Sequence, residues 1–143
     1  CFLRTPSYIS CEWALNRHGI LLQSPVVCTV LALDTAVGAS RNIQFGGVTI
    51  EFSRIASRLF NGFETKDGFN LAVPEKALLD LFYLNGIDVS HAFLDEMRIQ
   101  NTEMISLDQL TEDARRFGKP VMVKRAETLV DYIRERKDEE KML

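Results

Sequence analysis

The sequence has few of the residues that build disulfide frameworks, and it has no run that could cross a membrane. Its three cysteines, Cys1, Cys11 and Cys28, include no CxxC pair, and an odd number of cysteines cannot all be joined in disulfides. We therefore expect them to be small hydrophobic residues of the core, in a protein of a reducing compartment. No apolar run approaches the roughly 18 residues of a membrane span, and the N-terminus lacks the segments of a signal peptide. We therefore expect a cytoplasmic protein without a membrane segment.

A strong charge of one sign is also missing. The 143 residues carry a net charge of -3, with a pI near 5.4, so no overall field would draw the chain to nucleic acid or an anionic membrane. The composition, 46% apolar and 26% charged, is typical of one globular domain that can fold alone. We predict a single domain over residues 1–143, with a mixed α/β part over 1–84 and a helical part over 85–143.

Familiar catalytic and cofactor motifs are absent as well. The sequence has no HExxH, GxxxxGK[ST] or GxSxG, no GxGxxG after a strand, and no histidine and cysteine spacing that suits a metal. The acids and histidines that can act in catalysis occur singly: Glu51, Glu64, Asp80, His18 and His91. We expect no catalytic, cofactor or metal site.

The two histidines have simpler expected roles. His18 should help to end a helix beside Gly19, and His91 should be exposed after a capping Ser90.

Strand and turn signals alternate through the N-terminal half. A short strand at Tyr8-Ile9 leads into a helix that Ser10 can cap and Gly19 can end. Residues 26–33, VVCTVLAL, are nearly all apolar and typical of a buried strand. Residues 53–73 contain two further candidate short strands, joined by the polar turn TKDG.

A hairpin gives the clearest local signal. In NIQFGGVTIEF the two adjacent glycines separate alternating runs and can adopt the positive φ angles of a two-residue turn. Such a turn pairs Phe45 with Val48, and three steps further out it pairs Asn42 with Glu51, so that alternate pairs face core and solvent. Together these segments predict an α+β fold: a mostly antiparallel sheet of four or five strands packed with helices, then a helical C-terminal half.

The last third has helical spacing over residues 90–97, 106–117 and 126–140. Ser106 followed by Gln109 is a capping box. Apolar stripes follow in the last two helices: Leu107, Leu110, Ala114 and Phe117 in one, and Ala126, Leu129, Val130 and Ile133 in the other. We expect these helices to pack together, with Gly118 and Pro120 between them and the last ten residues frayed.

A further helix is predicted within NLAVPEKALLDLFYL, residues 70–84. Pro74 fits its first turn, and Glu75 places a negative charge near the positive end of the helix dipole. Apolar residues extend around most of the cylinder, so the helix should be buried. Asp80 is its polar interior residue, and Lys76, four residues earlier, is the expected partner. Packing alone explains the residues of this segment, so no catalytic role is needed for Asp80.

Basic residues crowd around the joint between the last two helices: Arg115, Arg116, Lys119, Lys124 and Arg125. Glu112, Asp113 and Glu127 partly neutralise them, which favours an ordinary solvated joint. The alternative, functional hypothesis is that these basic residues form a patch that binds an anion or a partner. Arg41, in the loop ahead of the hairpin, is a second candidate contact.

Two stretches form a joint pattern. Ser7-Tyr8-Ile9-Ser10 is followed by Ala14-Leu15 and His18-Gly19, and Ala72 to Asp80, AVPEKALLD, is followed by Tyr83-Leu84. The pattern resembles the "SYIS…AL…HG" opening and the "A-x-PEKALLD…YL" helix of the second domain in AbiEi-type antitoxins. The resemblance covers roughly residues 5–84, and Cys11 and Trp13 depart from it.

The resemblance implies a bacterial or archaeal antitoxin and transcriptional regulator. In that family an N-terminal winged helix-turn-helix binds the operator DNA of the toxin-antitoxin operon, and the C-terminal domain counters a cognate nucleotidyltransferase-like toxin. This chain would correspond to the C-terminal domain, with the winged helix absent from it. The matching residues are expected to be structural: Ser7, Tyr8, Ser10, His18, Gly19, Pro74, Glu75, Lys76, Leu78, Leu79 and Asp80.

The leading hypothesis is therefore a non-enzymatic antitoxin domain without cofactors. The alternative is a divergent metal-dependent nuclease or hydrolase whose acids, Glu51, Glu64 and Asp80, meet only in three dimensions. A third interpretation, a domain that contacts DNA by itself, predicts salt-dependent binding through Arg115 and Arg116.

Overall fold

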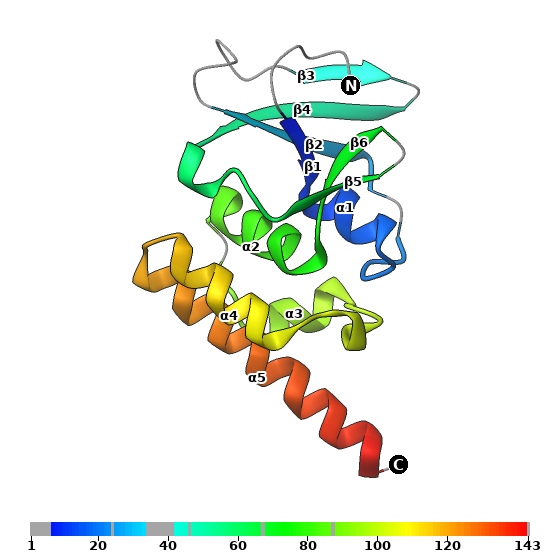
Figure 1. Cartoon of the computed structure of the whole chain (residues 1–143). Coiled ribbons are helices and arrows are strands. Elements are labelled where there is room, and N and C mark those ends of the chain that lie inside the picture. The colour runs from blue at the N-terminus through cyan, green and yellow to red at the C-terminus, as the bar shows by residue number, and fades with distance from the viewer. Residues whose placement is uncertain are drawn as a thin grey trace.

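In a computed structural model of the chain, a mixed β-sheet lies on one side and the helices lie together on the other (Figure 1). The structure describes residues 7–23, 25–33, 42–45, 47–66, 68–86 and 88–142. The strands are β1 (Ser7–Ser10), β2 (Val27–Leu33), β3 (Asn42–Phe45), β4 (Val48–Ile55), β5 (Phe63–Lys66) and β6 (Phe69–Ala72). The helices are α1 (Cys11–Arg17), α2 (Pro74–Asn85), α3 (His91–Met97), α4 (Leu107–Arg116) and α5 (Pro120–Met142), with short 3-10 turns at Ser57–Leu59 and Thr102–Met104.

The α+β class is confirmed, but the sheet differs from the prediction in two ways. Its six described strands have the order β3-β4-β2-β1-β6-β5, where four or five were predicted. The pairs β1–β2, β3–β4 and β5–β6 are antiparallel, whereas β1–β6 and β2–β4 are parallel, so the sheet is mixed rather than mostly antiparallel. Parallel pairs join strands that are distant in the sequence, and a local pattern carries no information about such pairs.

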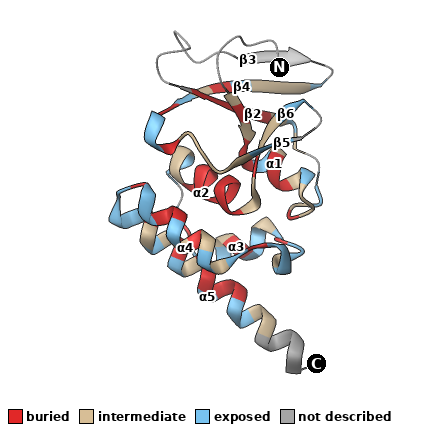
Figure 2. Cartoon of the chain, in the orientation of Figure 1, coloured by how far each residue is buried: buried red, intermediate tan, exposed pale blue. Residues whose placement is uncertain are grey.

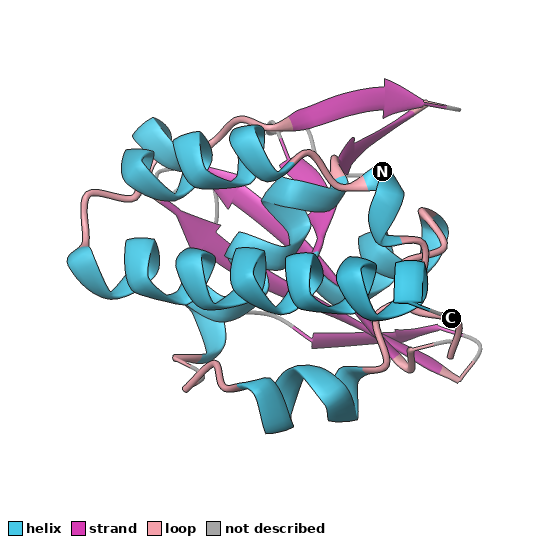
Figure 3. Cartoon of the chain, turned by 90° about the horizontal axis from the view of Figure 1, so that it is seen from below, coloured by secondary structure: helices cyan, strands magenta, loops and turns pink. Residues whose placement is uncertain are grey.

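Helices are also not confined to the C-terminal half. The first, α1, directly follows β1, and α2 follows β6. Seen from below, the helices lie across one face of the sheet (Figure 3). The main core forms between these layers and includes Leu15, Leu31, Leu78, Phe82 and Phe117, each with 1% or less of its surface exposed. Figure 2 shows this buried layer running through α1 and α2 and along the inner sides of α4 and α5.

The local predictions from periodicity are largely confirmed. The β3–β4 register pairs Phe45 with Val48 and Asn42 with Glu51, as the two-residue turn required. In β4, Glu51 is exposed and Phe52 is buried, which is the expected alternation. β5 and β6 pair antiparallel with Lys66 opposite Phe69, so Thr65 and Lys66 of the predicted turn TKDG belong to β5, while Asp67 lies outside the described residues. The apolar stripes of α4 and α5 meet in the main core.

The last helix is longer than predicted at both ends. It begins at Pro120 rather than at residue 126, because a proline lacks the N–H that the first helical turn leaves unpaired in any case. It continues to Met142, where fraying was expected. Gly118, with a φ of 69°, provides the left-handed residue between α4 and α5, so it separates the helices as predicted.

Candidate functional site

Four polar side chains from the two motif stretches meet inside the core. Lys76 Nζ lies 2.6 Å from Asp80 Oδ1, one turn along α2. Tyr8 and Ser10, which lie on the same face of β1, donate from their hydroxyls to Asp80 Oδ2 over 2.8 and 2.7 Å. Lys76 also donates to the Tyr8 hydroxyl over 2.9 Å. We call Tyr8, Ser10, Lys76 and Asp80 the buried polar cluster.

The buried polar cluster has no access to solvent. None of its four residues exposes more than 1% of its surface. Burial raises the pKa of the Asp80 carboxyl, while the Lys76 ammonium and the two hydroxyls act against that rise. Burial and the neighbouring Asp80 also raise the pKa of Tyr8. Every buried side-chain polar atom of the described residues has a partner, so Asp80 has the surroundings of a structural carboxylate.

The lysine stem reaches the cluster because Gly62 leaves room for it. Gly62 has a φ of 74°, and a Cβ added there would lie 2.6 Å from Lys76 Cγ. The ammonium group lies 5.2 Å from the centre of the Tyr8 ring and 5.4 Å from that of Phe117, so the sheet, α2 and the end of α4 all contact it. A glycine is therefore required at this position for both conformation and space.

The motif stretches meet again at His18. Its Nε2 lies 2.7 Å from the carbonyl oxygen of Ala72, and since that oxygen only accepts, Nε2 carries the proton. His18 was expected to end α1 with its ring at the helix's own carbonyls; instead its backbone caps α1 and its ring contacts the end of β6. Ser10 occupies the N-cap position of α1 as predicted, but its side chain makes no capping hydrogen bond, and its hydroxyl donates to Asp80.

The remaining motif residues have structural contacts. Pro74 begins α2 as predicted, and Leu78 and Leu79 are fully buried. Glu75, besides lying in the first turn of α2, accepts the backbone N–H of Ser106 over 2.9 Å. Ser106 in turn accepts the N–H of Gln109, so half of the predicted capping box is present and Glu75 replaces the other half.

Other motif contacts lie close by. The Gly19 carbonyl accepts from the Asn101 side chain over 2.7 Å, and the Ser7 carbonyl accepts from Asn70 over 3.0 Å.

The three acids of the nuclease alternative do not come together. Glu51 on β4 and Glu64 on β5 are exposed, whereas Asp80 is buried in α2. β4 and β5 are separated by three strands in the sheet order, which corresponds to roughly 19 Å at the usual strand spacing. Within the described ranges, no group of three or more acids, histidines or cysteines is placed to hold a metal ion.

The predicted basic residues fall into two groups. Arg125 donates to the carbonyl of Phe82 over 3.0 Å and so caps the end of α2, while Arg116 lies 3.5 Å from Asp113 and 3.7 Å from Glu112. Arg115, Lys119 and Lys124 are exposed, and the Lys119 ammonium lies 5.2 Å from the Tyr83 ring centre. Arg41 lies outside the residues that the structure describes.

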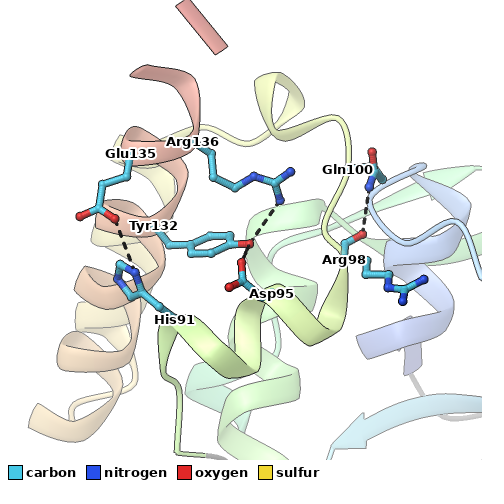
Figure 4. A pocket seen from close by; sticks show the side chains of 7 residues that line it. All are labelled: His91, Asp95, Arg98, Gln100, Tyr132, Glu135 and Arg136. Carbon is cyan, nitrogen blue, oxygen red and sulfur yellow. Dashed lines mark hydrogen bonds and ion pairs between the residues drawn. The ribbon is translucent and has the colours of Figure 1, made fainter. Parts of the chain in front are cut away.

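A hollow between α3 and α5 was not predicted. Its volume is about 460 Å³, and its lining is mostly polar. His91, Asp95, Tyr132 and Glu135 meet on one side of it, and Figure 4 shows Arg136 reaching across toward the turn that carries Arg98 and Gln100. The sequence contains only a faint signal for it: His91 with Asp95, and Tyr132 with Arg136, each four residues apart on a helix.

Comparison with known proteins finds no matching family model, no matching curated protein and no matching solved structure. None of the described helices combines the length and the apolar character that crossing a bilayer requires. The assignment of function therefore depends on the chain's own residues.

Proposed function

We propose that the chain is the antitoxicity-bearing domain of an AbiEi-like transcriptional regulator. In this proposal it has no enzymatic activity and counters a cognate nucleotidyltransferase-like toxin, directly or indirectly. A winged-helix domain in the full-length protein would supply the binding to operator DNA. The protein would act in the cytoplasm.

One observation supports this proposal above the others: the two motif stretches contact each other at two separate points. Tyr8 and Ser10 bind Asp80, and His18 binds the carbonyl of Ala72. The spacing between the two motif stretches therefore has a structural reason, because residues of the first stretch hold the second in position. A motif for catalysis would instead direct polar groups into a cleft.

Within this proposal, the partner binds to the exposed cations at the joint of α4 and α5, which are Arg115, Lys119 and Lys124. Within the described part of the chain, the side chains of Arg115 and Lys124 form no hydrogen bond or ion pair, and the Lys119 ammonium lies over the Tyr83 ring. Such groups are solvated, and they gain interaction energy when they meet an acidic surface. The toxin is the first partner to test.

A toxicity-rescue experiment tests the proposal. The chain, alone and joined to its upstream winged helix, is co-expressed with the nucleotidyltransferase encoded beside it, and growth is measured. Rescue by either form is expected. If neither form rescues growth while both are soluble and folded, the antitoxin assignment is wrong.

Charge-neutralised variants refine the same experiment. Replacing Arg115, Lys119 and Lys124 by glutamine should weaken rescue without lowering the urea midpoint, because all three are exposed. Arg134→Gln, on an exposed position of α5, is the matched control and should rescue fully. Equal rescue by both variants would remove this surface from the proposal.

A further inference from the structure

The outer side of α1 carries charges of both signs and the chain's single tryptophan. Glu12 and Arg17 are exposed and Trp13 is half-buried, while the buried residues of this helix face the core. With about 100° between successive residues, Trp13 lies between Glu12 and Arg17 around the helix. Figure 1 shows α1 and the segment that follows it at an outer edge of the molecule. This side of α1 is therefore open to a partner.

The segment after α1 presents apolar side chains to solvent. Leu22 and Val26 expose 70% and 68% of their surfaces, more than any other large apolar residue that the structure describes. The Asn16 side chain, on the outer side of α1, donates to the carbonyls of the residues before and after Leu22, over 2.9 and 3.2 Å. The Val26 carbonyl accepts the N–H of Thr49 over 2.8 Å. Because these contacts fix the backbone, both apolar side chains remain in water unless a partner covers them.

These side chains adjoin a second apolar cluster, on the face of the sheet that points away from the main core. Cys28, Val30 and Phe52 form this cluster, and Trp13 packs against it. Val26 lies two residues before Cys28, and its backbone is bonded to β4. Trp13 is thus anchored on one side by the cluster and exposed on the other. Residues anchored in this way are common among those that contribute most to the binding energy of an interface.

We propose that the chain binds a second copy of itself through this side of α1, in a dimer with two-fold symmetry. The contact consists of Glu12, Trp13, Arg17, Leu22 and Val26, which we call the α1 surface. In a two-fold dimer the same residues of both copies meet, so the surface must complement itself. The exposed cations at the joint of α4 and α5 are not part of it, so this proposal is independent of the antitoxin proposal.

The charges of the α1 surface complement themselves. Glu12 lies in the first turn of α1 and Arg17 in the last. Neither side chain forms a hydrogen bond or an ion pair within the residues that the structure describes. A two-fold axis that bisects the line between them at a right angle places each carboxylate opposite the guanidinium group of the other copy. The dimer then contains two equivalent ion pairs, with the two Trp13 side chains between them.

The same charge balance selects against other partners. Glu12 and Arg17 cancel, so the α1 surface has no net charge with which to attract the phosphates of nucleic acid or an anionic membrane. A second copy supplies both the opposite charges and an equal apolar area to cover Leu22 and Val26. The chain itself is therefore the partner that fits both features of the surface.

Sedimentation velocity of the full chain over a range of concentrations tests the proposal, with a thiol reductant present to exclude disulfide-linked species. A reversible equilibrium between monomer and dimer is expected. The fluorescence of Trp13 should shift to shorter wavelength with the same concentration dependence, because the indole leaves water as the dimer forms. A chain that stays monomeric up to about 1 mM would overturn the proposal, and so would a dimer that leaves the Trp13 emission unchanged.

Substitutions at the two exposed apolar residues separate association from folding. Leu22→Glu and Val26→Glu should each raise the dimer dissociation constant about tenfold or more, because they place charges in the apolar part of the contact. Their urea midpoints, measured where the chain is monomeric, should match that of the native chain, since both side chains are exposed.

Val121→Glu is the matched control, at an apolar position near the start of α5 that is 47% exposed. It should dimerise as the native chain does. Unchanged dissociation constants in Leu22→Glu and Val26→Glu, or equal weakening by all three variants, would exclude the α1 surface as the contact.

Exchange of the two charges tests the symmetry. Glu12→Arg alone places two guanidinium groups opposite each other at both ends of the contact and should weaken the dimer. Glu12→Arg combined with Arg17→Glu restores opposite charges in exchanged positions and should recover much of the affinity. A double variant as weak as the single one would contradict the two-fold arrangement.

Discussion

Lys76 and Asp80 form an ion pair of 2.6 Å that is almost wholly removed from water, with 2% and 0% of their side chains exposed. Removing one partner leaves a buried charge without compensation. We expect Lys76→Met to lower the free energy of unfolding by about 3–5 kcal/mol. Urea denaturation followed by circular dichroism measures this loss.

A double variant and a control complete that experiment. Lys76→Met combined with Asp80→Leu removes both charges and should be more stable than Lys76→Met alone. Lys124→Met, at an exposed position of α5, should change stability by less than about 0.5 kcal/mol. A double variant less stable than the single one would show that Asp80 is held mainly by Tyr8 and Ser10.

Gly62 offers a second test, because it combines a positive φ with a tight contact. Gly62→Ala would bring a Cβ to 2.6 Å from Lys76 Cγ, so the lysine stem or the backbone must shift. Gly68→Ala is a matched control, since its φ of 82° is similar but nothing lies within 4 Å of the added Cβ.

Gly68→Ala should therefore cost only the backbone strain, about 1–2 kcal/mol, and Gly62→Ala clearly more. Thermal or urea unfolding gives both values. Equal losses in the two variants would mean that Lys76 adapts without energetic penalty.

Glu75 links α2 to the start of α4, which suggests a third experiment. Glu75→Ala leaves the N–H of Ser106 without its acceptor and should lower stability by about 1–3 kcal/mol. Glu75→Gln keeps an oxygen at the same position and should lose less. Glu103→Ala, at an exposed position, serves as the control. If Gln and Ala at position 75 are equally destabilising, the negative charge rather than the hydrogen bond is what matters.

Alkaline pH should weaken the fold through Cys28. Burial raises the pKa of its thiol from 9.0 to about 11, so between these values the unfolded chain loses a proton that the folded chain keeps. The stability contributed by the neutral thiol is fully present below pH 9 and is lost progressively up to about pH 11. Burial also raises the pKa values of Cys11 and Tyr8, which act in the same direction.

The measurement is the urea midpoint between pH 8 and pH 11 for the native chain and for Cys28→Ala. The variant should show a shallower decline over this range, whatever its absolute stability at pH 8. Parallel curves would exclude Cys28 as a contributor.

Local periodicity predicted the parts of the fold that depend on neighbouring residues. The register of Phe45 with Val48 follows from a two-residue turn, and the Lys76–Asp80 pair follows from the four-residue spacing of a helix. The start of α5 was missed because Pro120 was taken as a separator, although proline is equally suited to a first turn.

The rest of the site depends on contacts between distant segments. Ser10 is 70 residues from Asp80, and Tyr132 is 37 residues from Asp95, so no local pattern joins them. Ser10 lies at the N-cap position of α1, where serine is common, but its side chain makes no capping hydrogen bond and its hydroxyl donates to the buried carboxylate of Asp80. The hollow follows from the packing of α3 against α5, which the sequence alone could not provide.

The position of β1 in the sheet has a consequence for synthesis. This strand is made well before β6, one of its two neighbours in the sheet, because β6 ends only at Ala72. The carboxylate that satisfies Tyr8 and Ser10 follows later still, at residue 80. Until these segments have been made, the edge of β1 that faces β6 stays unpaired and Tyr8 and Ser10 lack their acceptor, and an aggregation-suppressing chaperone would act in that interval.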